Sequence, residues 1–153
     1  LESLEIMTSI WSLLQIARES GPVPDLDISF VSELRNLRVC QLVYPYYTET
    51  NGLDLSGCES LRTLKIRSNS TDLKFLSGVS LEVLDISGSE VTSLDDLDVS
   101  RLKMINVSRC KIRSFKPLLR CEFLVKACLD NNPLEDPDDY GMVERIVLRN
   151  LSR

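Results

Sequence analysis

The side chains that most often carry out catalysis or bind metals are scarce in this sequence of 153 residues. Histidine is absent, so a Ser-His-Asp triad, a Cys-His pair and mixed Cys/His zinc sites are excluded. The five cysteines, at positions 40, 58, 110, 121 and 128, contain no Cys-x-x-Cys pair. Their odd number and spacing predict reduced structural thiols in an intracellular protein.

A run of carboxylates near the C-terminus is the second group that could do chemistry. Glu135, Asp136, Asp138 and Asp139 suggest calcium, which prefers oxygen ligands. The run contains Pro137 and lacks the D-x-D-x-D-G spacing of a calcium loop, so we reject this interpretation. The sequence also contains no P-loop and no glycine-rich phosphate loop. We therefore expect no metal, no cofactor and no enzymatic activity.

Three asparagines each begin an Asn-x-Ser/Thr tripeptide, the acceptor sequence for N-glycosylation: Asn69, Asn106 and Asn150. Two of them have structural explanations in a repeated leucine pattern of this chain. Asn69 occupies a position of that pattern where asparagine is usual, and Asn106 falls within a predicted strand. We expect a cytoplasmic or nuclear protein. A glycan on Asn69 or Asn150 would instead indicate an extracellular one, and that alternative stays open.

The elements that would position these residues are set by a repeated pattern between Leu81 and Leu134. It reads Leu81-x-x-Leu84-x-Ile86-x-x-Ser89-x-Val91, Leu102-x-x-Ile105-x-Val107-x-x-Cys110-x-Ile112 and Leu124-x-x-Ala127-x-Leu129-x-x-Asn132-x-Leu134. This is the L-x-x-L-x-L-x-x-N/C-x-L pattern of leucine-rich repeats, a short strand followed by a return segment. One unit cannot bury its apolar side alone, so the pattern predicts stacked units with a continuous core.

Earlier units fit the pattern less regularly. A first unit begins at Leu1 and a third at Leu61. The second has two possible registers, one beginning at Leu34 and the other at Leu37. We favour Leu34, because the six residues from there match those from Leu61 almost residue for residue. About six repeats, irregular before residue 60, are therefore predicted over residues 1–134.

The return segments and the C-terminus also show helical spacing. Apolar residues about three apart predict one buried turn in each return segment: Leu73 and Leu76, Leu94 and Leu97, Phe115 and Leu118. Residues 135–153 are predicted to form a helical cap with an N-cap at Asp138 or Asp139. Its buried face would contain Tyr140, Val143, Val147 and Leu151.

Two of these features resemble a particular family. The segments Val91-Thr-Ser-Leu94-Asp-Asp-Leu97 and Ile112-Arg-Ser-Phe115-Lys-Pro-Leu118, and the ending Asn132-Pro133-Leu134…Tyr140-x-x-Val143…Leu151, are similar to intracellular leucine-rich repeat proteins with a short, roughly 22-residue repeat and a C-terminal cap. That family includes a phosphatase regulatory subunit, the spliceosomal A-prime protein and a dynein light chain. The resemblance covers residues 61–151 well and residues 1–60 loosely. It implies an α/β solenoid with a short parallel β-sheet on the concave face and a helical C-terminal cap. It also implies non-catalytic protein binding, as a scaffold or adaptor.

The candidate binding residues lie between the inward leucines of each strand and face outward. In the favoured register one column reads Glu5, Arg38, Lys65 and Asp85. This column is either a ladder of cross-strand ion pairs or a ligand site, and the like charges of Arg38 and Lys65 favour a partner with an acidic segment. The predicted site, with a small apolar patch beside the charges, comprises Arg38, Lys65, Arg67, Val83, Asp85, Met104 and Asn106.

A second constellation is a band of basic residues flanked by acidic stretches. The band contains Arg101, Lys103, Arg109, Lys111, Arg113, Lys116, Arg120 and Lys126. We favour mutual neutralisation with the acidic neighbours over an RNA-binding patch, which would need interleaved aromatic residues. The net charge of −5 likewise argues against direct nucleic-acid binding. An RNP-associated module that binds a protein partner of RNA, or an extracellular adhesion or receptor domain, stays an alternative.

The sequence contains no apolar stretch long enough for a membrane span, so we expect no membrane partner. It begins without a methionine, on what resembles a repeat strand. We therefore expect it to be part of a larger chain or complex.

Overall fold

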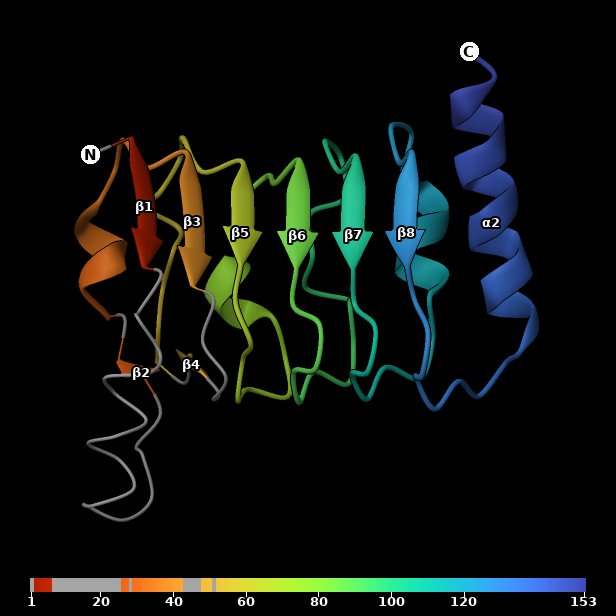
Figure 1. Cartoon of the computed structure of the whole chain (residues 1–153), viewed down its shortest axis with the longest axis horizontal. Coiled ribbons are helices and arrows are strands. Elements are labelled where there is room, and N and C mark those ends of the chain that lie inside the picture. Colours follow the sequence, from red (N-terminus) through yellow and green to blue (C-terminus); the bar gives the residue numbers. More distant parts are fainter. Residues whose placement is uncertain (1, 7–25, 28, 43–47, 51) are drawn as a thin grey trace.

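The computed structural model describes residues 2–6, 26–27, 29–42, 48–50 and 52–153. Its main feature is a parallel sheet of six short strands in the order β1-β3-β5-β6-β7-β8, which lie side by side along the long axis of the molecule (Figure 1). The strands are β1 (Ser3–Ile6), β3 (Val39–Leu42), β5 (Thr63–Lys65), β6 (Val83–Asp85), β7 (Met104–Asn106) and β8 (Lys126–Cys128). Each strand pairs with the strand of the next turn, so the chain is a solenoid. Leu1, where the first predicted unit begins, and residues 7–25 lie outside the described residues.

The segments that return from one strand to the next contain short turns of 3₁₀-helix: η1 (Ser29–Glu33), η2 (Lys74–Leu76) and η3 (Lys116–Arg120). A separate two-stranded sheet joins β2 (Leu26–Asp27) to β4 (Thr48–Glu49). The predicted apolar pairs of the return segments are all buried. In each pair the N–H of the later residue donates to the carbonyl of the earlier one, which closes a tight turn. Leu97, for example, donates its N–H to the Leu94 carbonyl at 3.1 Å. The prediction of one buried turn per return segment is confirmed.

The core follows from the register of the sheet. Leu64, Leu84, Ile105 and Ala127 are partners on neighbouring strands, and the first three side chains are at most 2% exposed. The next inward positions, Ile66, Ile86, Val107 and Leu129, are also buried. Inward residues therefore stack on inward residues from β5 to β8, as the repeat pattern predicts.

The favoured register of the second repeat is wrong, and the alternative that begins at Leu37 is correct. Cys40 is the partner of Leu64, and its side chain is fully buried, whereas the register from Leu34 would make Asn36, Arg38 and Cys40 face outward. Leu37 and Leu42 are buried on the same side. A strand alternates its faces at every residue, so the choice is decided by which set reaches the core. The match between the segments at Leu34 and Leu61 is a local similarity that the core overrides. Asn36 instead lies in the turn before the strand.

Side chains at the asparagine or cysteine position tie each turn to the previous one. The Cys110 thiol donates to the Ile86 carbonyl at 3.2 Å. Asn132 accepts the Ile112 N–H at 3.1 Å and donates to the Val107 carbonyl at 2.8 Å. These contacts satisfy backbone groups that the three-residue strands leave without a partner.

Helix α2 (Asp138–Leu151) follows the last strand and runs beside β8 at the end of the sheet (Figure 1). Its buried stripe differs from the predicted one. Val143 is buried, and Ile146 and Val147 pack against the core, whereas Tyr140 and Leu151 are 39% and 63% exposed. The predicted residues do form one stripe at about 100° per residue, but the buried face is centred nearer Val143 and Ile146, so Tyr140 and Leu151 lie at its edge.

Asp139 attaches the helix to the last turns of the solenoid. Contrary to the prediction, Asp139 does not cap the helix. It is fully buried, and its Oδ2 accepts the Phe115 N–H at 2.8 Å and the Ser114 hydroxyl at 2.7 Å. The N-cap position is Pro137, with no side-chain capping bond, and Asp136 Oδ1 accepts the Asp138 N–H at 3.0 Å in the turn before the helix. Beside it, the rings of Phe115 and Tyr140 meet edge to face with centroids 6.2 Å apart.

Replacement of Asp139 by alanine should lower the free energy of unfolding by about 1–3 kcal/mol, because the buried Phe115 N–H would lose its acceptor. Asp138→Ala is the matched control, since it removes a charge from the same helix turn but an exposed one. Urea denaturation followed by circular dichroism measures both. Equal losses for the two variants would show that the contribution is only the interaction of charge with the helix dipole.

Candidate functional site

The face of the sheet opposite the core, called here the open face, presents a row of three apolar side chains and one threonine. Val39, Thr63, Val83 and Met104 are partners in successive strands β3, β5, β6 and β7. The first three are half-buried and Met104 is 36% exposed. In β8 the row ends at Lys126. We call these four residues the apolar row.

A polar row runs parallel to it, two residues further along each strand. It consists of Gln41, Lys65, Asp85, Asn106 and Cys128. Asn106 donates to Asp85 Oδ2 at 3.2 Å, and both side chains accept an N–H of the turn that follows their own strand. Lys65 lies opposite Asp85, but no ion pair of Lys65 is found among the described residues. Its ammonium group is thus available to an external anion.

The structure does not assemble the predicted cluster of Arg38, Lys65 and Arg67. In the correct register Gln41 is the partner of Lys65, and Arg38 precedes β3, where its carbonyl accepts the N–H groups of Arg62 and Thr63. Arg67 is held elsewhere, because its Nε donates to the Gly88 carbonyl at 2.8 Å. Of the predicted site, Lys65, Val83, Asp85, Met104 and Asn106 share the open face.

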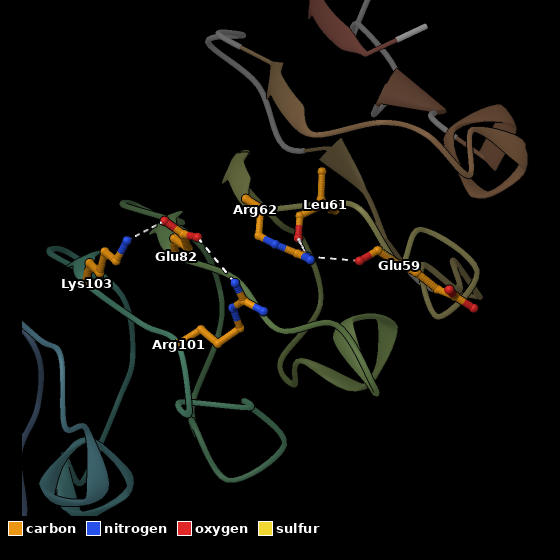
Figure 2. Close-up of polar contacts among 6 residues, drawn as sticks. All are labelled: Glu59, Leu61, Arg62, Glu82, Arg101 and Lys103. Carbon is orange, nitrogen blue, oxygen red and sulfur yellow. Dashed lines mark hydrogen bonds and ion pairs between the residues drawn. The ribbon is translucent and has the colours of Figure 1, made fainter.

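A third set of side chains precedes the strands and is charged. Glu82 accepts the Lys103 ammonium at 2.7 Å and lies 3.7 Å from the Arg101 guanidinium (Figure 2). The hydrogen bond from Lys103 holds the pKa of the Glu82 carboxyl below its usual value. Arg62 donates to the Glu59 and Leu61 carbonyls at 2.9 and 2.8 Å (Figure 2). The pairs of Glu82 join neighbouring turns at the edge of the apolar row, whereas the contacts of Arg62 stay within its own turn.

The basic band is partly neutralised across the turns of the solenoid. Besides the two residues bound to Glu82, Lys111 pairs with Glu90, and Arg113 lies 3.2 Å from Glu135. Only the pair of Arg113 with Glu135 involves the acidic stretches that flank the band in the sequence, because Glu82 and Glu90 lie outside them. The acidic stretch at 95–98 is not their partner, since Asp98 bonds to the Ser80 hydroxyl and the Ser100 N–H instead. For Arg109, Lys116, Arg120 and Lys126 no ion pair is found within the described part of the chain.

The remaining groups singled out in the sequence serve the fold. Glu135 pairs with Arg113, and Asp136 and Asp139 bind backbone N–H groups. Among the described residues, no group of three or more His, Cys, Asp or Glu side chains could hold a metal ion. Two of the sequon amides are engaged, because Asn106 donates to Asp85 and Asn150 donates to the Leu124 carbonyl at 2.9 Å.

All five cysteines are free thiols. Burial raises the pKa of Cys40 and of Cys121 to about 11, and it also raises the pKa of Cys58 and of Cys110. These four thiols are protonated at neutral pH and shielded by the core. Cys128, in the polar row, is half-buried. None of the four buried thiols is placed to act as a nucleophile.

Sequence analysis missed two features of the open face. Val39 and Gln41 belong to it only in the correct register, and the alternation of Leu37, Cys40 and Leu42 was the signal that could have found them. No pattern in the sequence indicates the contact between Arg67 and Gly88. A side chain at Gly88, whose φ is +72°, would come within 3.3 Å of Arg67 Nε. Only the folded turn shows this approach.

Iodoacetamide at mildly alkaline pH should modify Cys128 first in the folded protein, because the thiolate is the reactive form and the other thiols are buried with raised pKa values. In urea all five cysteines should react. Mass spectrometry of tryptic peptides over a time course measures each site. Labelling of Cys40 or Cys121 as fast as Cys128 in the folded protein would contradict the packing of the core.

Within the described part of the structure, no helix has the length and apolar character needed to cross a membrane. Comparison with known protein families found no family model that matches the chain, and comparison with curated proteins found no match.

Proposed function

We propose that this chain is a leucine-rich repeat module that binds a partner protein through the open face of its sheet, without catalysis. The observation that carries the proposal is the apolar row beside the polar row. Together they cross the strands from β3 to β7 and offer apolar contact next to hydrogen-bonding groups. Interface cores combine these two kinds of surface. The sequence resemblance to short-repeat, capped intracellular proteins supports the same proposal.

Met104 and Lys65 are the residues expected to contribute most. Met104 is the most exposed member of the apolar row and has an adaptable side chain. Lys65 has a charge without an ion-pair partner among the described residues, which favours a carboxylate on the partner. The expected partner therefore has an apolar surface with an acidic group, as the sequence suggested. Arg38 and Arg67 are no longer part of the site proposed to bind it.

The spacing of the rows favours a helical partner segment. Side chains in one row recur at the distance between strands, about 4.8 Å. A helix presents one residue of a stripe per turn of about 5.4 Å, whereas an extended chain presents one every 6.6 Å or so. A helix across the strands can thus stay in register with the apolar row over its four members. An extended segment would lose the register after two strands.

An intracellular location is the second part of the proposal. All five cysteines are free and four of them are buried, which is typical of proteins from a reducing compartment. The amides of Asn106 and Asn150 are donors within the fold, which disfavours glycosylation there. Support for the extracellular alternative is correspondingly weaker.

The test replaces two members of the apolar row, Val83→Thr with Met104→Glu. The substitutions keep a β-branched residue in the strand and place a charge where the partner is expected to bury apolar surface. We expect loss of capture of the partner, measured by quantitative mass spectrometry after affinity purification from cell extract. The melting temperature should change little.

The matched control is Thr71→Glu with Ser100→Thr, which introduces the same charge and a β-branched residue at two exposed positions outside the sheet. It should capture the same proteins as the wild type. If the apolar-row variant captures them as well as the control does, the open face is not the binding surface.

A further inference from the structure

A groove of about 530 Å³ lies among the turns that follow the arrowheads of strands β5 to β8 (Figure 1). Each turn contributes to it the residue two positions beyond the polar row: Arg67, Ser87, Ser108 and Asp130. These residues come from successive turns, so the groove runs parallel to the polar row. We call it the turn groove.

The next position in three of these turns has a left-handed backbone. Gly88, Arg109 and Asn131 occupy equivalent places after β6, β7 and β8, and their φ angles are +72°, +58° and +60°. All three line the turn groove. Glycine and asparagine adopt this conformation readily, whereas a long side chain such as arginine does so rarely. A turn of the same shape could be made with asparagine, as at position 131, so the fold does not require arginine at 109.

The acidic side chains of the turn groove are engaged within the fold, whereas the side chain of Arg109 is not. Glu90 forms an ion pair with Lys111. Asp130 Oδ1 accepts the Tyr140 hydroxyl at 2.6 Å. In the described residues, the Arg109 side chain has no hydrogen bond and no ion pair. The turn groove thus presents an unmatched guanidinium group among carboxylates that already have donors.

Two further donors line the same groove. The Ser87 hydroxyl has no hydrogen bond among the described residues, since its contact with Asp85 uses the backbone N–H. Arg67 lies across Gly88: its Nε donates to the Gly88 carbonyl at 2.8 Å, and a Cβ at Gly88 would come within 3.3 Å of that nitrogen. This bond fixes the Arg67 guanidinium at the wall of the groove and, because its acceptor is neutral, does not cancel the charge.

A phosphate monoester matches these donors better than the other common anions do. It has three acceptor oxygens and a charge of about −2, and guanidinium groups bind it through paired N–H donors. Two guanidinium groups and one hydroxyl supply a donor for each oxygen, whereas a carboxylate has only two oxygens. A phosphodiester chain continues on both sides of each phosphate, where Glu90 and Asp130 would repel it.

We propose that the turn groove binds a phosphorylated side chain of the partner protein, with Arg109 as its principal ligand and Ser87 and Arg67 beside it. The proposal deepens the proposed function and rests on it, because a segment on the open face passes beside a groove that runs parallel to the polar row. The groove volume of about 530 Å³ is within the range of sites that enclose small ligands.

The test titrates ¹⁵N-labelled protein with N-acetyl-phosphoserine amide and follows the backbone amide signals by NMR. We expect saturable shifts at Gly88 and Arg109. N-acetyl-glutamate amide is the carboxylate comparison and dimethyl phosphate is the phosphodiester comparison. Each should bind at least about tenfold more weakly than the phosphoserine probe, a difference of about 1.4 kcal/mol.

The variant Arg109→Asn separates binding from stability, because it copies the residue at the equivalent position 131. Asparagine suits the positive φ, so the melting temperature should stay the same or rise. Binding of the phosphoserine probe should fall at least about tenfold. Arg120→Asn is the matched control, since it makes the same substitution at an exposed position outside the groove, and it should bind the probe as the wild type does.

Four results would overturn the proposal. They are the absence of saturable shifts, equal binding of either comparison compound, unchanged binding by Arg109→Asn, and a clear fall in the melting temperature of that variant, which would give Arg109 a structural role instead.

Phosphatase treatment of the cell extract connects the turn groove to the partner. It should abolish capture by the wild-type protein. Capture that survives phosphatase but is lost in the apolar-row variant would keep the proposed function and overturn the assignment of the groove. Binding of the phosphoserine probe together with phosphatase-sensitive capture that the apolar-row variant retains would keep the groove and overturn the open face as the binding surface.

Discussion

Every strand in this solenoid depends on its neighbour for both its apolar contacts and its backbone hydrogen bonds. Strands β5 to β8 are three residues long, so none of them could bury a side chain or satisfy its backbone alone. The stack supplies both: Leu84 packs between Leu64 and Ile105, while Cys110 and Asn132 bind carbonyls of the preceding turn. At the end of the stack, α2 supplies what a further turn would supply, through Val143 and the buried carboxylate of Asp139.

The same register decides what the molecule presents to a partner. Because inward residues must stack on inward residues, the residues between them are aligned across the sheet, which creates the apolar row and the polar row. Half of the basic band pairs with carboxylates across turns, as Lys103 with Glu82 shows. Lys65 and Lys126 are without such a pair in the described chain and lie beside exposed apolar side chains. The proposed binding surfaces therefore consist of side chains that are neither packed in the core nor paired between turns.

The regular part of the chain was predictable, because each consensus position has one physical role. The pattern from Leu81 to Leu134 predicted the strands and the buried turns of that part of the chain. Prediction failed where two patterns competed. At the second repeat, similarity to the segment at Leu61 pointed to one register and the alternation around Cys40 to another. In α2, the predicted stripe was placed too far towards Tyr140 and Leu151, whereas the buried face is centred on Val143 and Ile146. The roles of Asp139 and Arg67 depend on contacts distant in sequence, which no local pattern contains.

The pairing of Gln41 with Lys65 is the point on which both rows depend, and cross-linking measures it directly. Neighbouring strands are about 4.8 Å apart, within the range that a disulfide bridges. In a Cys128→Ser background, the pair Gln41→Cys with Lys65→Cys should form a disulfide under mild oxidation, detected by mass spectrometry of the folded protein. The pair Arg38→Cys with Lys65→Cys should remain reduced. Efficient cross-linking of position 38, and none of position 41, would show that β3 pairs in the other register and that the two rows do not exist as described.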